Sequence, residues 1–97
     1  MAGLKFEWDK KKASANAKKH KVTFDEAKSV FYDERARLID DPVYSDDEER
    51  FVLLGMSSAV RTLVVVHCCR ESESTIRLIS ARKATRAEIQ IYDEFSS

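Results

Sequence analysis

Residues 50–81, RFVLLGMSSAVRTLVVVHCCRESESTIRLISA, decide the fold of this chain. Three runs in this stretch are rich in aliphatic and β-branched residues, and each has the length of a strand. The predicted strands are Arg50–Met56, Arg61–Cys68 and Thr75–Ala81. Short turns separate them, at Ser57-Ser58 and at the polar segment Arg70–Ser74. Because short connections favour antiparallel pairing, we expect the three strands to form a meander.

The residues before this stretch predict one strand and two helices. Residues 4–9 alternate apolar and charged side chains, which is typical of a half-buried strand. Asp9 is suited to cap a helix over Lys10–Lys19, because the alanines of that segment favour helix. The sequence Thr23-Phe24-Asp25-Glu26 is a capping box, so a second helix begins there.

The remaining segments complete an α+β fold. Arg37–Asp40 is a candidate strand, and the acidic segment Asp41–Glu49, which contains the one proline, is predicted to be a loop. A second capping box, residues 85–88, opens a final helix that runs to about Phe95. We therefore expect a small antiparallel sheet with two N-terminal helices packed on it and a C-terminal helix. The length of 97 residues suits a single domain over residues 1–97.

Composition and motifs exclude several classes of protein. A hydrophobic content of 43% supports a folded core, and no apolar run is long enough to span a bilayer. Residues 1–9 lack the apolar run of a signal peptide, so we expect a cytoplasmic protein without membrane contact. Glycine-rich nucleotide loops, zinc-peptidase motifs and serine-hydrolase motifs are missing from the sequence. Cys68 and Cys69 are adjacent and not spaced as metal ligands, so we expect neither a metal nor a cofactor.

The neutral total charge hides a basic N-terminal segment. Residues 1–22 hold seven lysines and two acidic residues, a net charge of +5, whereas residues 23–50 hold ten acidic and four basic residues, a net charge of −6. Helical spacing places three polar residues of this segment on one face, with His20 at the end. The three are Lys12, Asn16 and Lys19. Such a face can bind phosphate, and a histidine can transfer protons near neutral pH. A solvated lysine face closed by a histidine explains the same residues.

Two arginines at the last predicted strand, together with Ser80, form a second candidate. Arg77 is expected to share a strand face with apolar neighbours such as Ala81, and Arg82 lies at the strand end. An arginine among apolar neighbours needs a cleft or a partner, and guanidinium groups bind phosphate through two hydrogen bonds. Alternatively, Arg77 or Arg82 forms an internal ion pair with Glu88 or with an acid of the 41–49 loop.

A third candidate combines Arg61, Glu88, Tyr92 and the N-terminal Trp8. A carboxylate, a phenol and arginines suffice for phosphodiester cleavage without metal. A base takes the proton of the ribose 2′-hydroxyl, a cation stabilises the phosphorane and an acid protonates the leaving 5′-oxygen. Alternatively, Glu88 only completes the capping box and Tyr92 only packs in the core. Trp8 alternates with Phe6, which favours a core position over a base-stacking one.

The sequence resembles the BrnT-like toxin family over almost the whole chain, in the order and the spacing of its motif residues. The resemblance is carried by Phe6-Glu7-Trp8-Asp9, Lys12, Asn16, Lys19-His20, Val22, Phe24, Ala27, Phe31, Asp33, Asp41-Pro42, Glu49-Arg50, Gly55, Arg61, Val65, Arg70, Ile76–Ala84, Glu88 and Tyr92. It implies a type II toxin with a RelE-like fold that degrades RNA without a metal and halts translation. It also implies a BrnA-like antitoxin with a ribbon-helix-helix-type DNA-binding element. The toxin would then contact operator DNA only through this antitoxin.

The resemblance assigns family motif positions to residues already singled out. The catalytic candidates are His20, Arg61, Arg77, Arg82, Glu88 and Tyr92, and the RNA-binding candidates are Lys12, Asn16 and Lys19. We expect Arg77 and Arg82 to bind the scissile phosphate with help from Arg61. His20 or Glu88 is the candidate proton acceptor, and Tyr92 orients a base or donates a proton. Two other functions remain open: a non-catalytic RNA- or partner-binding module, and a subunit that mainly represses its operon with the antitoxin.

Overall fold

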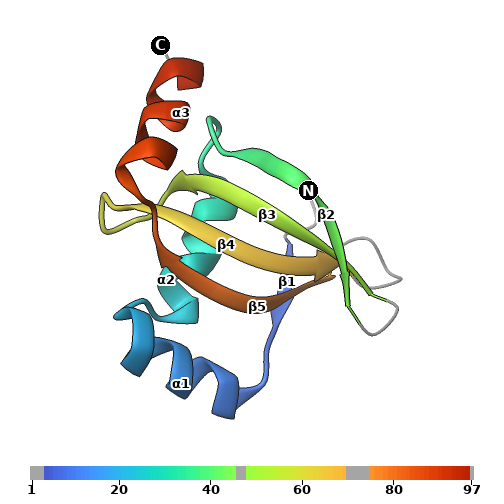
Figure 1. Ribbon diagram of the computed structural model, residues 1–97. Coiled ribbons are helices and arrows are strands. Elements are labelled where there is room, and N and C mark those ends of the chain that lie inside the picture. Colours follow the sequence, from blue (N-terminus) through green and yellow to red (C-terminus); the bar gives the residue numbers. More distant parts are fainter. Residues whose placement is uncertain (1–3, 46–47, 70–74, 97) are drawn as a thin grey trace.

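A single five-stranded sheet lies at the centre of the computed structural model, which describes residues 4–45, 48–69 and 75–96 (Figure 1). In chain order the elements are β1 (Lys5–Glu7), α1 (Lys10–His20), α2 (Phe24–Ser29), the 3₁₀ helix η1 (Val30–Tyr32), β2 (Arg37–Ser45), β3 (Glu48–Met56), β4 (Thr62–Cys69), β5 (Thr75–Lys83) and α3 (Arg86–Ser96). The strand order is β1-β5-β4-β3-β2. Neighbouring strands are antiparallel except β1, which runs parallel to β5. The predicted α+β class is confirmed, but the parallel β1 makes the sheet mixed rather than wholly antiparallel.

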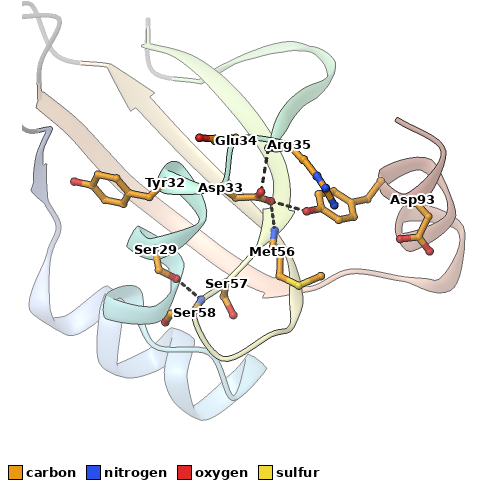
Figure 2. Close-up of a pocket in the computed structure, with 10 residues that line it drawn as sticks. Ser29, Tyr32, Asp33, Glu34, Arg35, Met56, Ser57, Ser58 and Asp93 are labelled. Carbon is orange, nitrogen blue, oxygen red and sulfur yellow. Dashed lines mark hydrogen bonds between the residues drawn. The ribbon is translucent and has the colours of Figure 1, made fainter. Parts of the chain in front are cut away.

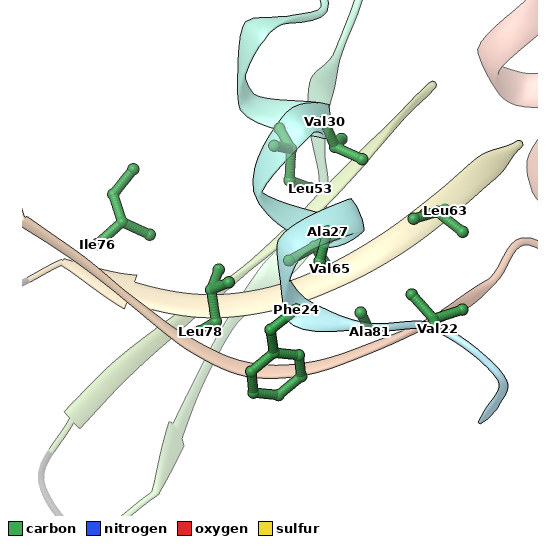
Figure 3. Packing of buried hydrophobic residues seen from close by; sticks show 10 residues of the cluster. All are labelled: Val22, Phe24, Ala27, Val30, Leu53, Leu63, Val65, Ile76, Leu78 and Ala81. Carbon is green, nitrogen blue, oxygen red and sulfur yellow. The ribbon is translucent and has the colours of Figure 1, made fainter. Parts of the chain in front are cut away.

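The two faces of the sheet are covered by different helices. α1, α2 and η1 lie on one face and enclose the main core there; in Figure 1, α2 is seen behind the strands and α1 lies below β5. This core consists of Val22, Phe24, Ala27, Val30, Leu53, Leu63, Val65, Ile76, Leu78 and Ala81 (Figure 3). On the opposite face, Tyr92 of α3 packs with Leu54 and Val64 near one end of the sheet. We call this second side, which also carries Val52 and Val66, the α3 face.

Hydrogen bonds at the helix starts confirm the predicted caps. Asp9 accepts hydrogen bonds from two backbone N–H groups in the first turn of α1. The Oγ1 atom of Thr23 accepts from the Glu26 N–H at 3.1 Å. Thr85 and Glu88 bond each other in both directions, at 2.8 and 3.2 Å, which is a complete capping box. The three helices therefore begin where their short polar sequences predict.

The prediction that residues 41–49 form a loop is wrong for residues 41–45 and 48–49, and residues 46–47 lie outside the described residues. β2 continues to Ser45 and β3 already begins at Glu48. A register shift between Ile39 and Val43 accommodates Pro42, and β2 is an edge strand bonded only to β3 on its inner side. Proline is tolerated in edge strands and at bulges, because a missing N–H there breaks no ladder hydrogen bond. The predicted turn at 70–74 lies outside the described residues.

The predicted orientation of Arg77 is also wrong, because β5 contains a bulge. Ser80 pairs with Val66 and Leu78 pairs with His67, so Ile79 is an extra residue in the ladder. One extra residue reverses the alternation of side chains beyond it. Arg77 therefore does not share a face with Ala81; it lies on the α3 face together with Arg82.

Candidate active site

Arg61 is held at the end of the sheet where β4 begins. Its Nε donates to Oε2 of Glu26 at 2.9 Å, and its Nη2 donates to Oε1 of the same carboxylate. Nη2 also donates to the carbonyl oxygen of Lys21 at 3.1 Å. Ser57 donates a further hydrogen bond to Glu26, at 2.6 Å. The hydrogen bond from Arg61 lowers the pKa of Glu26, so the pair is ionised and its geometry is fixed.

His20 is the last residue of α1 and lies next to this cluster. The chain turns sharply after it, because Lys21 adopts a left-handed conformation with φ of 60° and ends the helix. Since Arg61 bonds the Lys21 carbonyl, the predicted His20 and Arg61 lie in the same region. Lys12 and Lys19 are exposed on α1. These lysines precede and follow Asn16 by about one helical turn.

Asn16 is a buried structural residue, 7% exposed. Its Nδ2 donates to the carbonyl oxygens of Val22 and Ala81, each at 2.9 Å, and its Oδ1 accepts from the Ala81 N–H at 3.1 Å. β1 pairs with β5 only from Thr75 to Arg77, so the side chain of Asn16 takes the place of a strand neighbour farther along β5. These hydrogen bonds occupy the amide, and Asn16 is not part of the RNA contact that we propose below.

Arg82 and Glu88 form a two-pronged ion pair between β5 and α3. Nη1 donates to Oε1 at 2.8 Å and Nη2 donates to Oε2 at 2.9 Å. Oε1 also accepts the capping hydrogen bond from the Thr85 N–H. The hydrogen bonds from Arg82 lower the pKa of Glu88 to about 2. A carboxylate with that pKa is a weak base at neutral pH, so Glu88 is suited to orient Arg82 rather than to accept a proton.

Tyr92 is buried, and its hydroxyl is bonded to Asp33, a residue to which the sequence analysis assigned no role. Its hydroxyl donates to Oδ2 of Asp33 at 2.7 Å, and the same oxygen accepts from the Met56 N–H at 2.8 Å (Figure 2). Burial and the bond to Asp33 raise the pKa of Tyr92 to about 12. A phenol that holds its proton so firmly is a poor acid or base at neutral pH. The sequence offered one indication of such a partner, because the hydroxyl of a buried tyrosine usually needs a hydrogen-bond partner.

A depression of about 670 Å³ opens beside this contact. It is lined by Ser29, Tyr32, Asp33, Glu34, Arg35, Met56, Ser57, Ser58, Tyr92 and Asp93 (Figure 2). The carboxylate of Asp33 in this depression accepts hydrogen bonds from the N–H groups of Met56 and Arg35. Burial alone would raise the pKa of Asp33, but these hydrogen bonds lower it overall. Of the candidate catalytic residues, only Tyr92 contributes to this lining.

Arg77 lies toward the other end of β5 from Arg82. Its Nη1 donates to Oε2 of Glu7 at 3.1 Å, and Glu7 is its register partner on β1. The internal pairing of both arginines that the sequence left open is therefore present, with Glu7 as an additional acid. Trp8 packs against the main core, with its ring edge-on to Phe24 at 5.8 Å between centroids.

Comparison with known proteins now adds to this geometry. The sequence model of the family described as "Ribonuclease toxin, BrnT, of type II toxin-antitoxin system" matches residues 8–88. The chain belongs to the BrnT family of toxins. A crystal structure of the Brucella abortus ribonuclease toxin BrnT is similar in fold, with a TM-score of 0.65 and 24% sequence identity. That alignment covers 86% of this chain and 99% of the Brucella chain. Among curated proteins, none matches this chain.

The BrnT match includes most of the candidate site. Arg61, Arg77, Arg82 and Glu88 lie within residues 8–88, whereas Tyr92 lies beyond them. In the part of the BrnT chain that the structure describes, no three His, Cys, Asp or Glu side chains gather as metal ligands would. None of its described helices is long and apolar enough to cross a membrane.

Proposed function

We propose that this BrnT-family chain is an endoribonuclease whose site lies at the end of the sheet where β4 begins and β5 ends. The observation that carries the proposal is that Arg61, Arg82 and the His20 end of α1 all lie at this end of the sheet, Arg82 on the α3 face and Arg61 on the side of α2 and Lys21. Arg61 and Arg82 are held by carboxylates, so their guanidinium planes are oriented before a substrate arrives. Such preorganised donors stabilise developing negative charge well, because nothing has to reorient during the reaction.

The cleavage that we propose is an attack of a ribose 2′-oxygen on the adjacent phosphorus. His20 accepts the proton of the 2′-hydroxyl, the new bond closes a 2′,3′-cyclic phosphate and the bond to the 5′-oxygen breaks. The leaving oxygen takes its proton from water. Arg82 and Arg61 stabilise the phosphorane, a role that a metal ion plays in other nucleases. Glu88 and Tyr92 act as positioning residues, because their shifted pKa values oppose proton transfer near neutral pH.

The lysines of α1 supply the proposed contact with the RNA backbone. Lys12 and Lys19 are exposed and flank the part of α1 that packs on β5 through Asn16. Their contribution is electrostatic and independent of base sequence. In the cytoplasm, cleavage of RNA would inhibit translation. A BrnA-like antitoxin would neutralise the toxin and provide the only contact with operator DNA.

A specific observation favours a second candidate, a non-catalytic module. Both side chains that the sequence offered beside His20 for proton transfer, Glu88 and Tyr92, are engaged by Arg82 and Asp33. A module of this kind would bind RNA or the antitoxin through the same arginines and leave RNA intact. The complex with its antitoxin would then act mainly on the operon.

Cleavage of RNA by the purified, antitoxin-free protein in EDTA tests the main proposal. We expect products that end in a 2′,3′-cyclic phosphate from the parent and from Arg86→Ala, whose exposed arginine is a matched control. Arg82→Ala and His20→Gln should yield no such products. Intact RNA with a folded parent would refute free-RNA cleavage, and intact RNA in the presence of ribosomes as well would favour the non-catalytic module.

A further inference from the structure

Arg50 is a third arginine of the α3 face, after Arg77 and Arg82, and it lies apart from the end of the sheet that holds the candidate active site. Its Nε atom is buried and has no hydrogen-bond partner. Among the side chains that the structure describes, in residues 4–39, 50–69 and 75–95, no acid is paired with its guanidinium. A buried N–H donor without a partner is unusual in a native protein, so this nitrogen calls for a partner such as a water or a ligand.

The register of the sheet brings Arg50 into line with Arg77. Phe51 pairs with His67, so the preceding Arg50 stands opposite Cys68, and Cys68 pairs on its other side with Arg77. Phe51 and His67 point to the main-core face, where their rings contact each other, and so Arg50 lies on the α3 face. We call Arg50, Cys68, Arg77 and Glu7 the four-strand row, because these residues lie side by side on β3, β4, β5 and β1.

The two guanidinium groups of this row suit phosphate. Arg50 and Arg77 are two strands apart, which is about 10 Å between their backbones, and both side chains are long enough to meet over Cys68. Glu7 accepts a hydrogen bond from one nitrogen of Arg77, at 3.1 Å, and its single negative charge balances one of the two arginine charges. Arg50 therefore gives the row its net positive charge, and its planar donors match the oxygens of a phosphate.

We propose that Arg50 and Arg77 bind a backbone phosphate of the RNA strand at a distance from the bond that is cut. This inference rests on the proposed ribonuclease function. It extends that site, because the bulge at Ile79 puts Arg77 on the same face as Arg82. Their partners on β4, Cys68 and Val64, are four residues apart, so the two arginines are about 13 Å apart along the sheet. Two anion sites at that separation on one face suit a chain of phosphates better than a single small anion.

The test measures binding of a single-stranded RNA oligonucleotide with 2′-O-methyl riboses, which lacks the attacking hydroxyl and stays intact. The dissociation constant is determined over a range of salt concentrations for the parent, Arg50→Gln and Arg77→Gln. Each lost phosphate contact should lower the slope of log K against log salt by about 0.7. We expect Arg50→Gln to bind roughly tenfold more weakly at low salt. Arg86→Gln, which removes an exposed arginine from α3, should keep the slope of the parent.

The possible outcomes separate this inference from the proposed function. A parent that cleaves and binds RNA while a folded Arg50→Gln keeps the full slope would overturn the inference alone. A parent that binds no RNA would overturn both. Weaker binding of the antitoxin with unchanged RNA binding would assign the row to a protein partner and also overturn the inference. If Arg50→Gln does not fold, Arg50→Lys replaces it: this variant keeps the charge and should keep the salt slope of the parent. Arg77→Gln should still lower the slope by about 0.7.

Discussion

The two ends of β5 present arginine in two different ways. At one end, Arg82 is joined to Glu88 by two hydrogen bonds of 2.8 and 2.9 Å, and Arg61, at the same end of the sheet, is joined to Glu26. At the other end, Arg77 makes one hydrogen bond of 3.1 Å to Glu7. Arg50 beside it has a buried nitrogen without a partner.

This difference indicates different tasks for cations of the same type. An arginine fixed by a carboxylate is oriented and still presents donors to a substrate, which suits the place where charge develops in a reaction. An arginine with few internal partners attracts a polyanion but does not define its position closely. We therefore expect chemistry at the Arg82 end and backbone binding at the Arg77 end, and the following predictions test this division.

Replacing Arg82 should have the largest effect on activity. We expect Arg82→Ala to lower kcat for RNA cleavage about a hundredfold to a thousandfold, because it removes a preorganised donor from the phosphorane. Arg77→Ala should mainly raise KM and leave kcat within a few fold. The measurement is a cleavage time course at varied RNA concentration for each variant. Equal effects of the two substitutions on kcat would abolish the distinction between the two ends.

Replacing Asn16 should have the largest effect on stability. Asn16→Ala leaves the N–H and carbonyl groups of Ala81 without partners in a buried position. We expect a loss of about 3 kcal/mol in the free energy of unfolding, measured by urea denaturation. Ser14→Ala, an exposed change on the same helix, should be neutral or slightly stabilising. A similar stability for both variants would refute the structural role of Asn16.

Sequence patterns were sufficient for the local elements and for the family. The capping residues Asp9, Thr23 and Thr85 predict where the helices begin, because a cap depends on residues within one turn of each other. The last three strands followed from their apolar runs and short connections. These features are local, and so one sequence shows them.

The features that sequence reasoning missed depend on contacts between distant residues. The bulge at Ile79, which places Arg77 on the same face as Arg82, results from pairing with β4. No glycine in β5 indicates it in the sequence. Asn16 looked like part of a basic face, because its backbone partners on β5 are 65 positions away. Glu26 was recognised only as a capping acid, although its carboxylate pairs with Arg61.

Breaking the carboxylate pairs compares the two ends directly. Glu88→Gln should lower the free energy of unfolding at pH 7 by about 1–2 kcal/mol, because the carboxylate is mostly buried and accepts three hydrogen bonds. Glu7→Gln should cost less than about 1 kcal/mol, as is usual for an ion pair whose carboxylate is partly exposed to solvent. Urea denaturation of both variants measures the difference. If Glu7→Gln loses more free energy of unfolding than Glu88→Gln, Arg77 rather than Arg82 is the more firmly held arginine.

The stabilising effect of Glu88 also predicts a pH range. The pKa of Glu88 is about 2 in the folded chain, below its ordinary value of 4.5. Its contribution is therefore complete above pH 4.5 and is lost as the pH falls from there toward 2. In Glu88→Gln the loss of stability over this range should be smaller than in the parent.

The smallest effect that we expect comes from His67, which lies beneath the four-strand row on the main-core face. It is 5% exposed and packs edge-on against Phe31 at 4.8 Å between ring centroids. Burial lowers its pKa below the ordinary value of 6.5, because a charged imidazole is poorly solvated there. Its contribution to stability is thus complete above pH 6.5 and decreases as the pH falls below that value toward the folded pKa.

Two variants separate this pH range from that of Glu88. His67→Phe keeps the aromatic packing without a titratable group, so its stability should not decrease as the pH falls from 6.5 toward 5. Glu88→Gln should keep that decrease, because it leaves His67 unchanged. Denaturation at several pH values measures both. If His67→Phe loses as much stability as the parent in this range, another group is responsible, and the far end of the sheet has no pH dependence of its own.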